Sequence, residues 1–255
     1  MTISDSWLEN RAEELEASIV FCTRLPLLRA TPLTDNSLSR AAWAFPVAGI
    51  VVGLIGAIVY GIAHRLGLPP WPAAALSVAA TMLATGCLHE DGLADTADGF
   101  GGGNTREQKL AIMRDSHIGA YGVCALAMSL VLRVGALASL PSAHAVVWAL
   151  IASHAAARAT MPALMLLLPP ARNDGLSFDA GRPPGETVAA AAVIGFLILI
   201  FGLRFGRGLL ALIALAVVAP FVAWLAKRQI GGQTGDVLGA LEQVSEVAVL
   251  LVALG

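Results

Sequence analysis

The sequence predicts an all-α fold, a polytopic integral membrane helical bundle of about seven transmembrane helices preceded by an N-terminal amphipathic helix. Of its 255 residues, 57% are hydrophobic and 13% are charged, against roughly 25% charged residues in soluble domains. The mean hydropathy is +0.75, and several apolar runs approach the roughly 20 residues that a helix needs to cross a bilayer. No linker or low-complexity stretch divides the chain, so we expect a single domain over residues 1–255.

The N-terminal segment, residues 1–40, is expected to contain an amphipathic helix over 5–28. Leu8, Leu15 and Ile19 recur at near-helical spacing, and Pro26 ends or bends the element. The first 20 residues carry five acids, one arginine and no apolar core, which is unlike a cleavable signal peptide. We expect this helix to lie on the membrane surface, with lipid as its partner.

Seven spans account for the remaining apolar runs. They are expected at 43–63, 71–88, 119–140, 143–168, 187–203, 208–226 and 237–255. The third contains Arg133, and the fourth contains His154, Arg158 and Pro162, so a break at Pro162 would make eight spans. Small residues are dense at 49–57, 73–81 and 154–161, which favours close helix–helix approach.

The distribution of basic residues orients the bundle. With the N-terminus inside, eleven of the sixteen Lys and Arg residues lie on the inner side and three on the outer side, as the positive-inside rule requires. The segments 89–118, 169–186 and 227–236 then share the cytoplasmic face. The net charge of −2 offers no electrostatic argument for a nucleic-acid partner.

An acidic stripe opens the most informative segment, residues 89–118. In HEDGLADTADGFGGG, Asp91, Asp95 and Asp98 are spaced i, i+4 and i+7 and so share one stripe of a helix. Three carboxylates on one stripe repel each other, whereas Mg²⁺ prefers oxygen ligands and keeps room for phosphate oxygens. We therefore predict that these aspartates bind Mg²⁺ beside a phosphate at the membrane surface; a solvated helix face is the alternative.

Glycines and a basic helix follow the stripe. The glycines at 99 and 101–103 are expected to break the helix, and Gly101, Gly102 and Gly103 would let backbone amides approach a phosphate. A short helix over 105–114 then begins with Thr105 as N-cap. The side chains on it that could neutralise a diphosphate, or only anchor the segment by the positive-inside rule, are Arg106, Lys109 and Arg114.

Three further residues are catalytic candidates. Asp115 follows the basic helix as a fourth acid and could be the general base or another metal ligand. His117 could contact phosphate or act as the base, or be a surface residue. His89 lies off the stripe, where it could either cap the end of a span or take a catalytic or metal-binding role.

A second polar island covers residues 230–247. Thr234 or Asp236 could cap the last span. Glu242 and Glu246 then follow inside an apolar run, which makes them functional candidates, unless they pair with Arg133 or Arg158 across helices. The loop 169–184 is either a substrate-facing cap or a connector.

The segment HEDGLADTADGFGGG at 89–103, followed by KLAIMRDSHIGAYGV, resembles the adenosylcobinamide-GDP ribazoletransferase family. FCTRLP, FPVAGIVVGLIGA and GGQTGDVLGALEQVSE also resemble that family in the expected order, so the resemblance covers most of the chain. It implies a multi-pass enzyme of the bacterial inner membrane, with its active site on the cytoplasmic face. The implied reaction joins adenosylcobinamide-GDP to α-ribazole or its 5′-phosphate and releases GMP, late in vitamin B12 synthesis.

Two other functions compete with this one. The first is another Mg²⁺-dependent membrane phosphotransferase of the CDP-alcohol type, although the spacing DG-x-AD at 91–95 differs from the DG-x2-AR of that group. The second is an ion-coupled transporter that uses Asp91, Glu242 and Glu246. Acids at the span midplane would favour transport, and acids at the cytoplasmic edge favour the enzyme. The sequence does not decide whether the protein forms a homo-oligomer. It also does not determine which base the acceptor nucleoside carries as the lower base of the cobalamin product.

Overall fold

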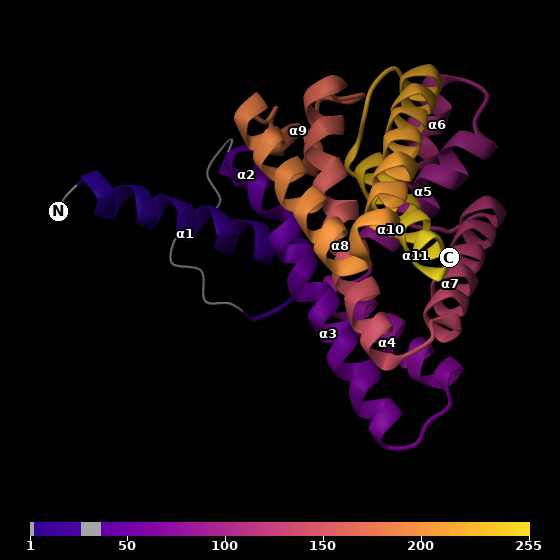
Figure 1. The fold of residues 1–255 in the computed structure, drawn as a ribbon. Helices are drawn as coiled ribbons and strands as arrows, with labels where there is room; N and C mark the ends of the chain where they lie inside the picture. Colours follow the sequence, from indigo (N-terminus) through magenta and orange to yellow (C-terminus); the bar gives the residue numbers. More distant parts are fainter. Residues whose placement is uncertain (1–2, 27–36) are drawn as a thin grey trace.

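A computed structural model describes residues 3–26 and 37–255, and the chain is all-α over these residues, without a β-strand. Figure 1 shows the helices in chain order. Their bounds are α1 Ile3–Cys22, α2 Ser37–Ala41, the 3-10 helix η1 Ala42–Ala44, α3 Phe45–Arg65, α4 Pro70–Thr85, α5 Leu88–Gly102, α6 Arg106–Ile112, α7 Ala120–Ser139, α8 Ala143–Leu167, α9 Leu176–Ala180, α10 Gly185–Ile230 and α11 Gly235–Leu254.

Helix α10 is too long for one crossing. Its 46 residues would extend about 69 Å as a straight helix, more than twice the hydrocarbon thickness. Arg204 has non-helical backbone angles (φ 65°, ψ 157°), and Gly208 packs back against the backbone of Leu199 and Ile200. The chain therefore reverses at Arg204, and the two halves diverge from that point (Figure 1). The predicted spans 187–203 and 208–226 are these two halves.

Among the described residues, five or six segments are long and apolar enough to cross a membrane, and division of α10 at Arg204 brings the number to the predicted seven. Five helices are long and apolar enough to cross a membrane, namely α3, α7, α8, α10 and α11. A sixth span would consist of α4 and α5 together, which are bent by 90° relative to each other. The second half of α10 adds the seventh. Helix α8 continues through Pro162, so the eight-span alternative is wrong.

Helix α8 is the centre of the bundle, where it packs against α3, α10 and α11. Small residues allow its closest crossing. A Cβ placed on Gly53 of α3 would lie 2.7 Å from Cα of Ile151 on α8, a separation that only glycine permits. The predicted role of the small-residue run 49–57 in helix approach is confirmed at this crossing.

Helix α1 extends sideways from the bundle (Figure 1). Its residues 8–13 are exposed, whereas Ala17, Ser18 and Cys22 near its C-terminal end are buried. The Ser18 hydroxyl donates a hydrogen bond of 2.6 Å to the Ala41 carbonyl, which attaches α1 to α2. The helix ends at Cys22, before Pro26, and the end of the predicted helix at 27–28 lies outside the described residues.

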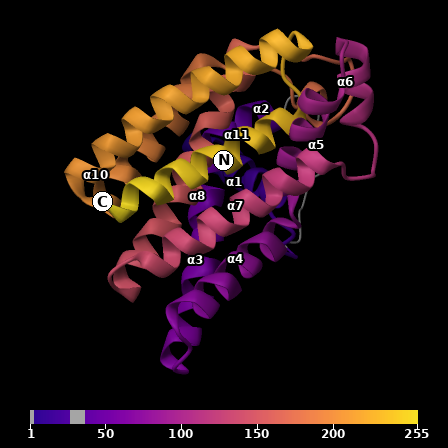
Figure 2. The same ribbon diagram turned by 90° about the vertical axis from the view of Figure 1, so that its right-hand side faces the viewer.

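The bundle has one polar end. Helices α5, α6 and α9 gather there, while the α3–α4 and α7–α8 turns and the α10 reversal lie at the opposite end (Figures 1 and 2). Gly86 and Cys87 both have left-handed backbone angles (φ 65° and 58°), and they turn the chain from α4 into α5. We take α3, α4, α7, α8, the two halves of α10, and α11 as the spans, with α5 at the polar end.

Candidate active site

The predicted acidic helix is confirmed as α5, and its three aspartates differ in environment. Asp91 is exposed, Asp95 is half-buried, and Asp98 is buried. The Asp98 carboxylate accepts hydrogen bonds from the backbone N–H groups of Gly119 (2.7 Å) and Gly122 (2.9 Å). Asp98 therefore fixes the N-terminus of α7 against α5, in addition to any contact it makes with a cation.

A fourth carboxyl group joins the stripe from the other end of the chain. Asp236 lies in the first turn of α11, where the Thr234 hydroxyl accepts the N–H of Val237 at 3.3 Å, so the predicted N-cap is Thr234. Burial, together with the charges of Asp91, Asp236 and Asp98, raises the pKa of Asp95 to about 7. The nearby carboxylates therefore outweigh the one cation that acts on Asp95, the guanidinium group of Arg172.

This donor set fits a hard cation that keeps much of its water. In the described part of the chain, the only group of three acidic, histidine or cysteine ligand atoms within 4.8 Å of one another is elsewhere, in the membrane-embedded core. A cation at the stripe would therefore be held by one or two carboxylates, with water and substrate oxygens completing its shell. That arrangement is typical of Mg²⁺ and untypical of a closed structural metal site.

A groove of about 470 Å³ runs along α5, between α4, α6 and α7. Asp91 and Asp95 line it together with Arg114 and Asp115. The structure thus brings Asp115, predicted as a fourth acid, into the same cavity as two aspartates of the stripe. A cavity of this size matches the usual volume of small-molecule sites.

The loop that carries Asp115 is held by a local hydrogen-bond pair. The Asp115 carboxylate accepts the backbone N–H of His117 at 3.0 Å and lies 2.7 Å from the Nδ1 atom of His117. These hydrogen bonds lower the pKa of Asp115, so its carboxylate is ionised at neutral pH. His117 is exposed and lies outside the groove lining; its predicted contact with phosphate stays a prediction.

The predicted phosphate-binding residues each have a partner within the protein. Lys109 donates to the Phe100 carbonyl at 3.1 Å, near the end of α5, and Arg106 donates to the Ala171 carbonyl at 2.8 Å. Arg114 binds both oxygens of Asp174, at 2.6 and 2.7 Å. Of the three, only Arg114 lines the groove. These bonds tie the polar loops together, and phosphate binding by these side chains stays a prediction.

The predicted helix break at the glycines occurs only at the end of the glycine run. Helix α5 continues through Gly99 and Gly101 and ends at Gly102, with Gly103 as its C-cap. A Cβ on Gly101 would lie 2.7 Å from the ring of Tyr121, and one on Gly103 would lie 2.7 Å from the backbone nitrogen of Lys109. The glycines therefore allow α6 and the start of α7 to pack against α5; amide contacts of Gly101, Gly102 and Gly103 with substrate stay a prediction.

A buried ionic network lies beneath the acidic stripe. Arg133 of α7 binds Glu246 of α11 (2.9 Å) and Glu90 of α5 (2.8 Å). Arg158 of α8 binds Glu242 of α11 at 2.5 Å. All five side chains are almost fully buried. The predicted pairing of the two glutamates with Arg133 and Arg158 is confirmed, so these acids are partners of arginines rather than free ion sites.

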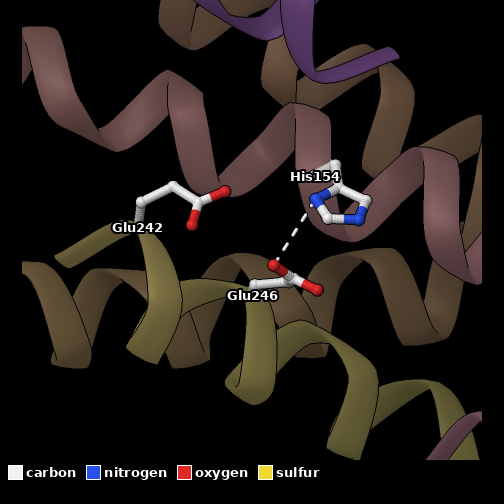
Figure 3. A group of neighbouring side chains, drawn as sticks. All are labelled: His154, Glu242 and Glu246. Atoms are coloured by element: carbon white, nitrogen blue, oxygen red, sulfur yellow. Dashed lines mark ion pairs between the residues drawn. The ribbon is translucent and has the colours of Figure 1, made fainter. Parts of the chain in front are cut away.

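Figure 3 shows His154 of α8 facing Glu242 and Glu246 of α11, with Nδ1 3.4 Å from Oε2 of Glu246. This is the group whose ligand atoms lie within 4.8 Å of one another. However, guanidinium groups already bind these residues: Arg158 contacts Nδ1 of His154 and Oε1 of Glu242, and Arg133 contacts Oε1 of Glu246. A metal ion would add positive charge beside two arginines that already neutralise these glutamates, so we assign the cluster a structural role.

His89 belongs to this network and lies off the aspartate stripe. Its Nδ1 is 3.4 Å from Nη2 of Arg158 and 4.0 Å from Glu242. On the side of α5 away from the groove, His89 lines a second cavity of about 130 Å³. Asp91 lines both cavities, so the two meet at the first aspartate of the stripe.

Two residues of the site were missed by reasoning from the sequence. Asp236 was seen only as a helix cap, and Arg172 only as part of an undecided loop. Arg172 lines the second cavity and lies 3.5 Å from Asp236. The loop 169–184 also carries Asp174, the partner of Arg114, which makes it a cap over the polar end. The GGQTGD stretch before α11 was the only signal for Asp236.

Comparison with known proteins identifies relatives over nearly the whole chain. The family described as cobalamin-5-phosphate synthase matches residues 14–254. The chain is 55% identical over 246 residues to the adenosylcobinamide-GDP ribazoletransferase of Bradyrhizobium diazoefficiens, covering 96% of this chain and 95% of the relative. It is 54% identical over 241 residues to the enzyme of that name from Mesorhizobium japonicum, covering 94% and 92%. No solved structure matches the chain.

Proposed function

Because the chain belongs to the cobalamin-5-phosphate synthase family, we propose that it is an adenosylcobinamide-GDP ribazoletransferase. It would transfer the adenosylcobinamide-phosphate group of adenosylcobinamide-GDP to α-ribazole or its 5′-phosphate. The observation that carries this proposal is the meeting of two cavities at Asp91, beside a stripe of acids. Such a site can receive a phosphate donor and an acceptor from opposite sides of one helix.

The proposed chemistry is a single displacement at phosphorus. A ribose hydroxyl of the acceptor attacks the phosphorus attached to cobinamide, a new P–O bond forms, and the P–O bond to GMP breaks. The hydroxyl proton passes to a base, and GMP leaves with the electron pair. Phosphoryl transfer depends mainly on positioning and charge neutralisation. Here the groove positions the donor, and Arg114, at its wall, is placed to neutralise phosphate charge.

Mg²⁺ is the metal that we propose at the stripe, held by Asp91 and Asp95 with support from Asp98. Its contribution when bound would be to neutralise charge on the transferring phosphate. Support comes from the neighbouring carboxylates, which together with burial raise the pKa of Asp95 to about 7, and from the all-carboxylate donor set, which suits a hard cation.

The decisive assay uses the purified full-length protein in liposomes. We expect GMP release with adenosylcobinamide-GDP, α-ribazole 5′-phosphate and Mg²⁺, and loss of the reaction when EDTA removes the metal. Restored turnover on adding Mg²⁺ completes the test. Turnover with a CDP-alcohol and a lipid acceptor instead, but not with adenosylcobinamide-GDP, would support the second phosphotransferase and contradict our assignment.

Asp115 is the proposed general base, because it lines the same groove as Asp91 and Asp95. Asp115→Asn should lower kcat strongly while the Mg²⁺ concentration for half-maximal activity stays nearly constant, since a base affects proton transfer and a ligand affects metal affinity. Titrating Mg²⁺ against the rate separates the two roles. Rescue of the variant by higher Mg²⁺ would make Asp115 a ligand and direct the search for the base to His117 and then His89.

The polar end of the bundle is proposed to face the cytoplasm of a bacterial inner membrane, because eleven of sixteen basic residues lie on that side. Single cysteines at Asn104 and Asp174, in a background without the native cysteines, should resist an impermeant thiol reagent in sealed cells and react after lysis. Both positions are exposed, unlike the buried Gln233. Rapid labelling of either position from outside would contradict this topology and place the polar end on the outer side of the membrane.

A further inference from the structure

The second cavity is mostly enclosed by apolar side chains, with flat aromatic groups on one wall. Phe21 and Phe45 stack on each other, with ring centroids 5.7 Å apart and an interplanar angle of 12°. Met161 and Met165 of α8 also line the space. Its volume is about 130 Å³, close to the roughly 150 Å³ of an apolar cavity that binds benzene. The cavity is therefore of the right size and polarity for a small planar ring system.

His89 supplies a hydrogen-bond donor to this apolar surrounding. Arg158 can only donate, so the Nδ1 atom of His89, 3.4 Å from Nη2 of Arg158, is the acceptor of that contact. A neutral imidazole then carries its proton on Nε2. His89 is 1% exposed, and its Nε2 is buried without a hydrogen-bond partner among the described residues. Such a donor is costly unless a ligand satisfies it.

The polar side of the cavity leads toward the acidic stripe. Asp91 and Asp236 line it there, together with Arg172. The Nη1 atom of Arg172 is also buried without a hydrogen-bond partner among the described residues. A ligand whose ring system filled the apolar part could therefore extend a sugar or phosphate toward Arg172 and Asp91, where the groove begins.

We propose that this cavity binds the base of the acceptor nucleoside: a planar, apolar bicyclic ring whose unsubstituted ring nitrogen accepts a hydrogen bond from Nε2 of His89. The benzimidazole of α-ribazole has this chemistry, and its ribose would point toward Asp91. The inference rests on the proposed function and adds the acceptor's binding site to it. His89, predicted from the sequence as a catalytic candidate, becomes a specificity-determining residue instead.

Paired histidine variants test the proposal. His89→Asn keeps a group near the Nδ1 position but removes Nε2, and His154→Asn is the matched control. His154 is also a buried histidine that contacts Arg158 and has an unpartnered Nε2, but it lies outside the cavity lining. In steady-state assays, we expect His89→Asn to raise KM for α-ribazole roughly fivefold or more, with KM for adenosylcobinamide-GDP unchanged. His154→Asn should leave both values near wild type.

An acceptor analogue tests the same contact without a variant. In the indole counterpart of α-ribazole, a C–H group replaces the unsubstituted ring nitrogen. The wild-type protein should bind it roughly fivefold or more weakly than α-ribazole, and His89→Asn should bind the two equally. Equal binding of both by the wild type, or equal effects of the two histidine variants, would overturn the role of His89.

Filling the cavity tests its occupancy. Ala180 is buried and lines the space, so Ala180→Leu should raise KM for α-ribazole at least about tenfold and leave KM for the GDP substrate unchanged. An unchanged KM for α-ribazole would contradict the proposal while the transferase assignment stood. Equilibrium dialysis of labelled α-ribazole with the full-length protein and with Ala180→Leu measures the binding that depends on this cavity. If α-ribazole bound in the cavity but was not turned over, the transferase assignment would be refuted, while the proposed binding site for α-ribazole would stand.

Discussion

Asp95→Asn is expected to lower turnover at least about hundredfold while the bundle stays assembled. Asp95 has carboxylates on both sides of it in the stripe and a third from α11, and their charges together with burial raise its pKa to about 7. A cation is the simplest means of holding such a group ionised. Loss of even indirect metal contacts commonly costs 10–100-fold in activity or affinity, so loss of a direct ligand should cost more.

The measurement is the initial rate of GMP release over a series of Mg²⁺ concentrations, with gel filtration to confirm that the variant is folded. Glu107→Gln is the matched control, because it removes an exposed acid from the neighbouring helix α6. Asp91→Asn should behave like Asp95→Asn. Asp98→Asn should also loosen the start of α7, whose N–H groups it accepts. Near wild-type turnover by folded Asp95→Asn protein would refute the metal site.

Arg133→Leu is expected to destabilise the protein by about 3–5 kcal/mol, the usual cost of leaving buried partners unpaired. Arg133 is 1% exposed and binds two glutamates from α5 and α11, and its Nη2 lies 3.3 Å from Oγ1 of Thr81 on α4. The leucine removes one positive charge and leaves two carboxyl groups in an apolar environment. For a chain of this size, the apparent Tm should fall by roughly 10 °C.

Thermal unfolding in detergent measures this effect, and Arg65→Leu serves as the control because Arg65 is exposed at the end of α3. A second variant isolates the cause. Replacing Glu90 and Glu246 by glutamine in the Arg133→Leu background removes both unpaired acids, so it should recover much of the lost Tm. If the triple variant were less stable than the single one, uncompensated charge would not be the cause.

Local periodicity was sufficient to predict the helices and the stripe. The 3.6-residue repeat of α5 determines that Asp91, Asp95 and Asp98 share one face, and the polar residues near Arg204 separate the two halves of α10. Likewise, Thr105 caps α6 by a capping box that can be recognised in the sequence. These features depend only on residues close together along the chain.

The partners of the charged groups could not be predicted, because they come from distant segments. Arg106 and Lys109 looked free to bind phosphate, yet each donates to a backbone carbonyl, and carbonyls have no pattern in a sequence. Asp236 reaches the stripe only because α11 crosses α5 closely at Gly92, where a Cβ would lie 2.8 Å from the Asp236 carbonyl oxygen. That crossing is a property of the assembled bundle.

The order of synthesis gives the buried network a consequence for biogenesis. Helices α7 and α8 emerge from the ribosome with Arg133 and Arg158 before α11 supplies Glu246 and Glu242. Until the last helix inserts, Arg158 lacks its carboxylate and Arg133 has only Glu90. Arginines without partners are costly within a bilayer, so a chain truncated before α11 should be retained by the insertion machinery or degraded. Insertion of α11 would thereby be the step that allows the bundle to become stable, because it supplies the missing carboxylates.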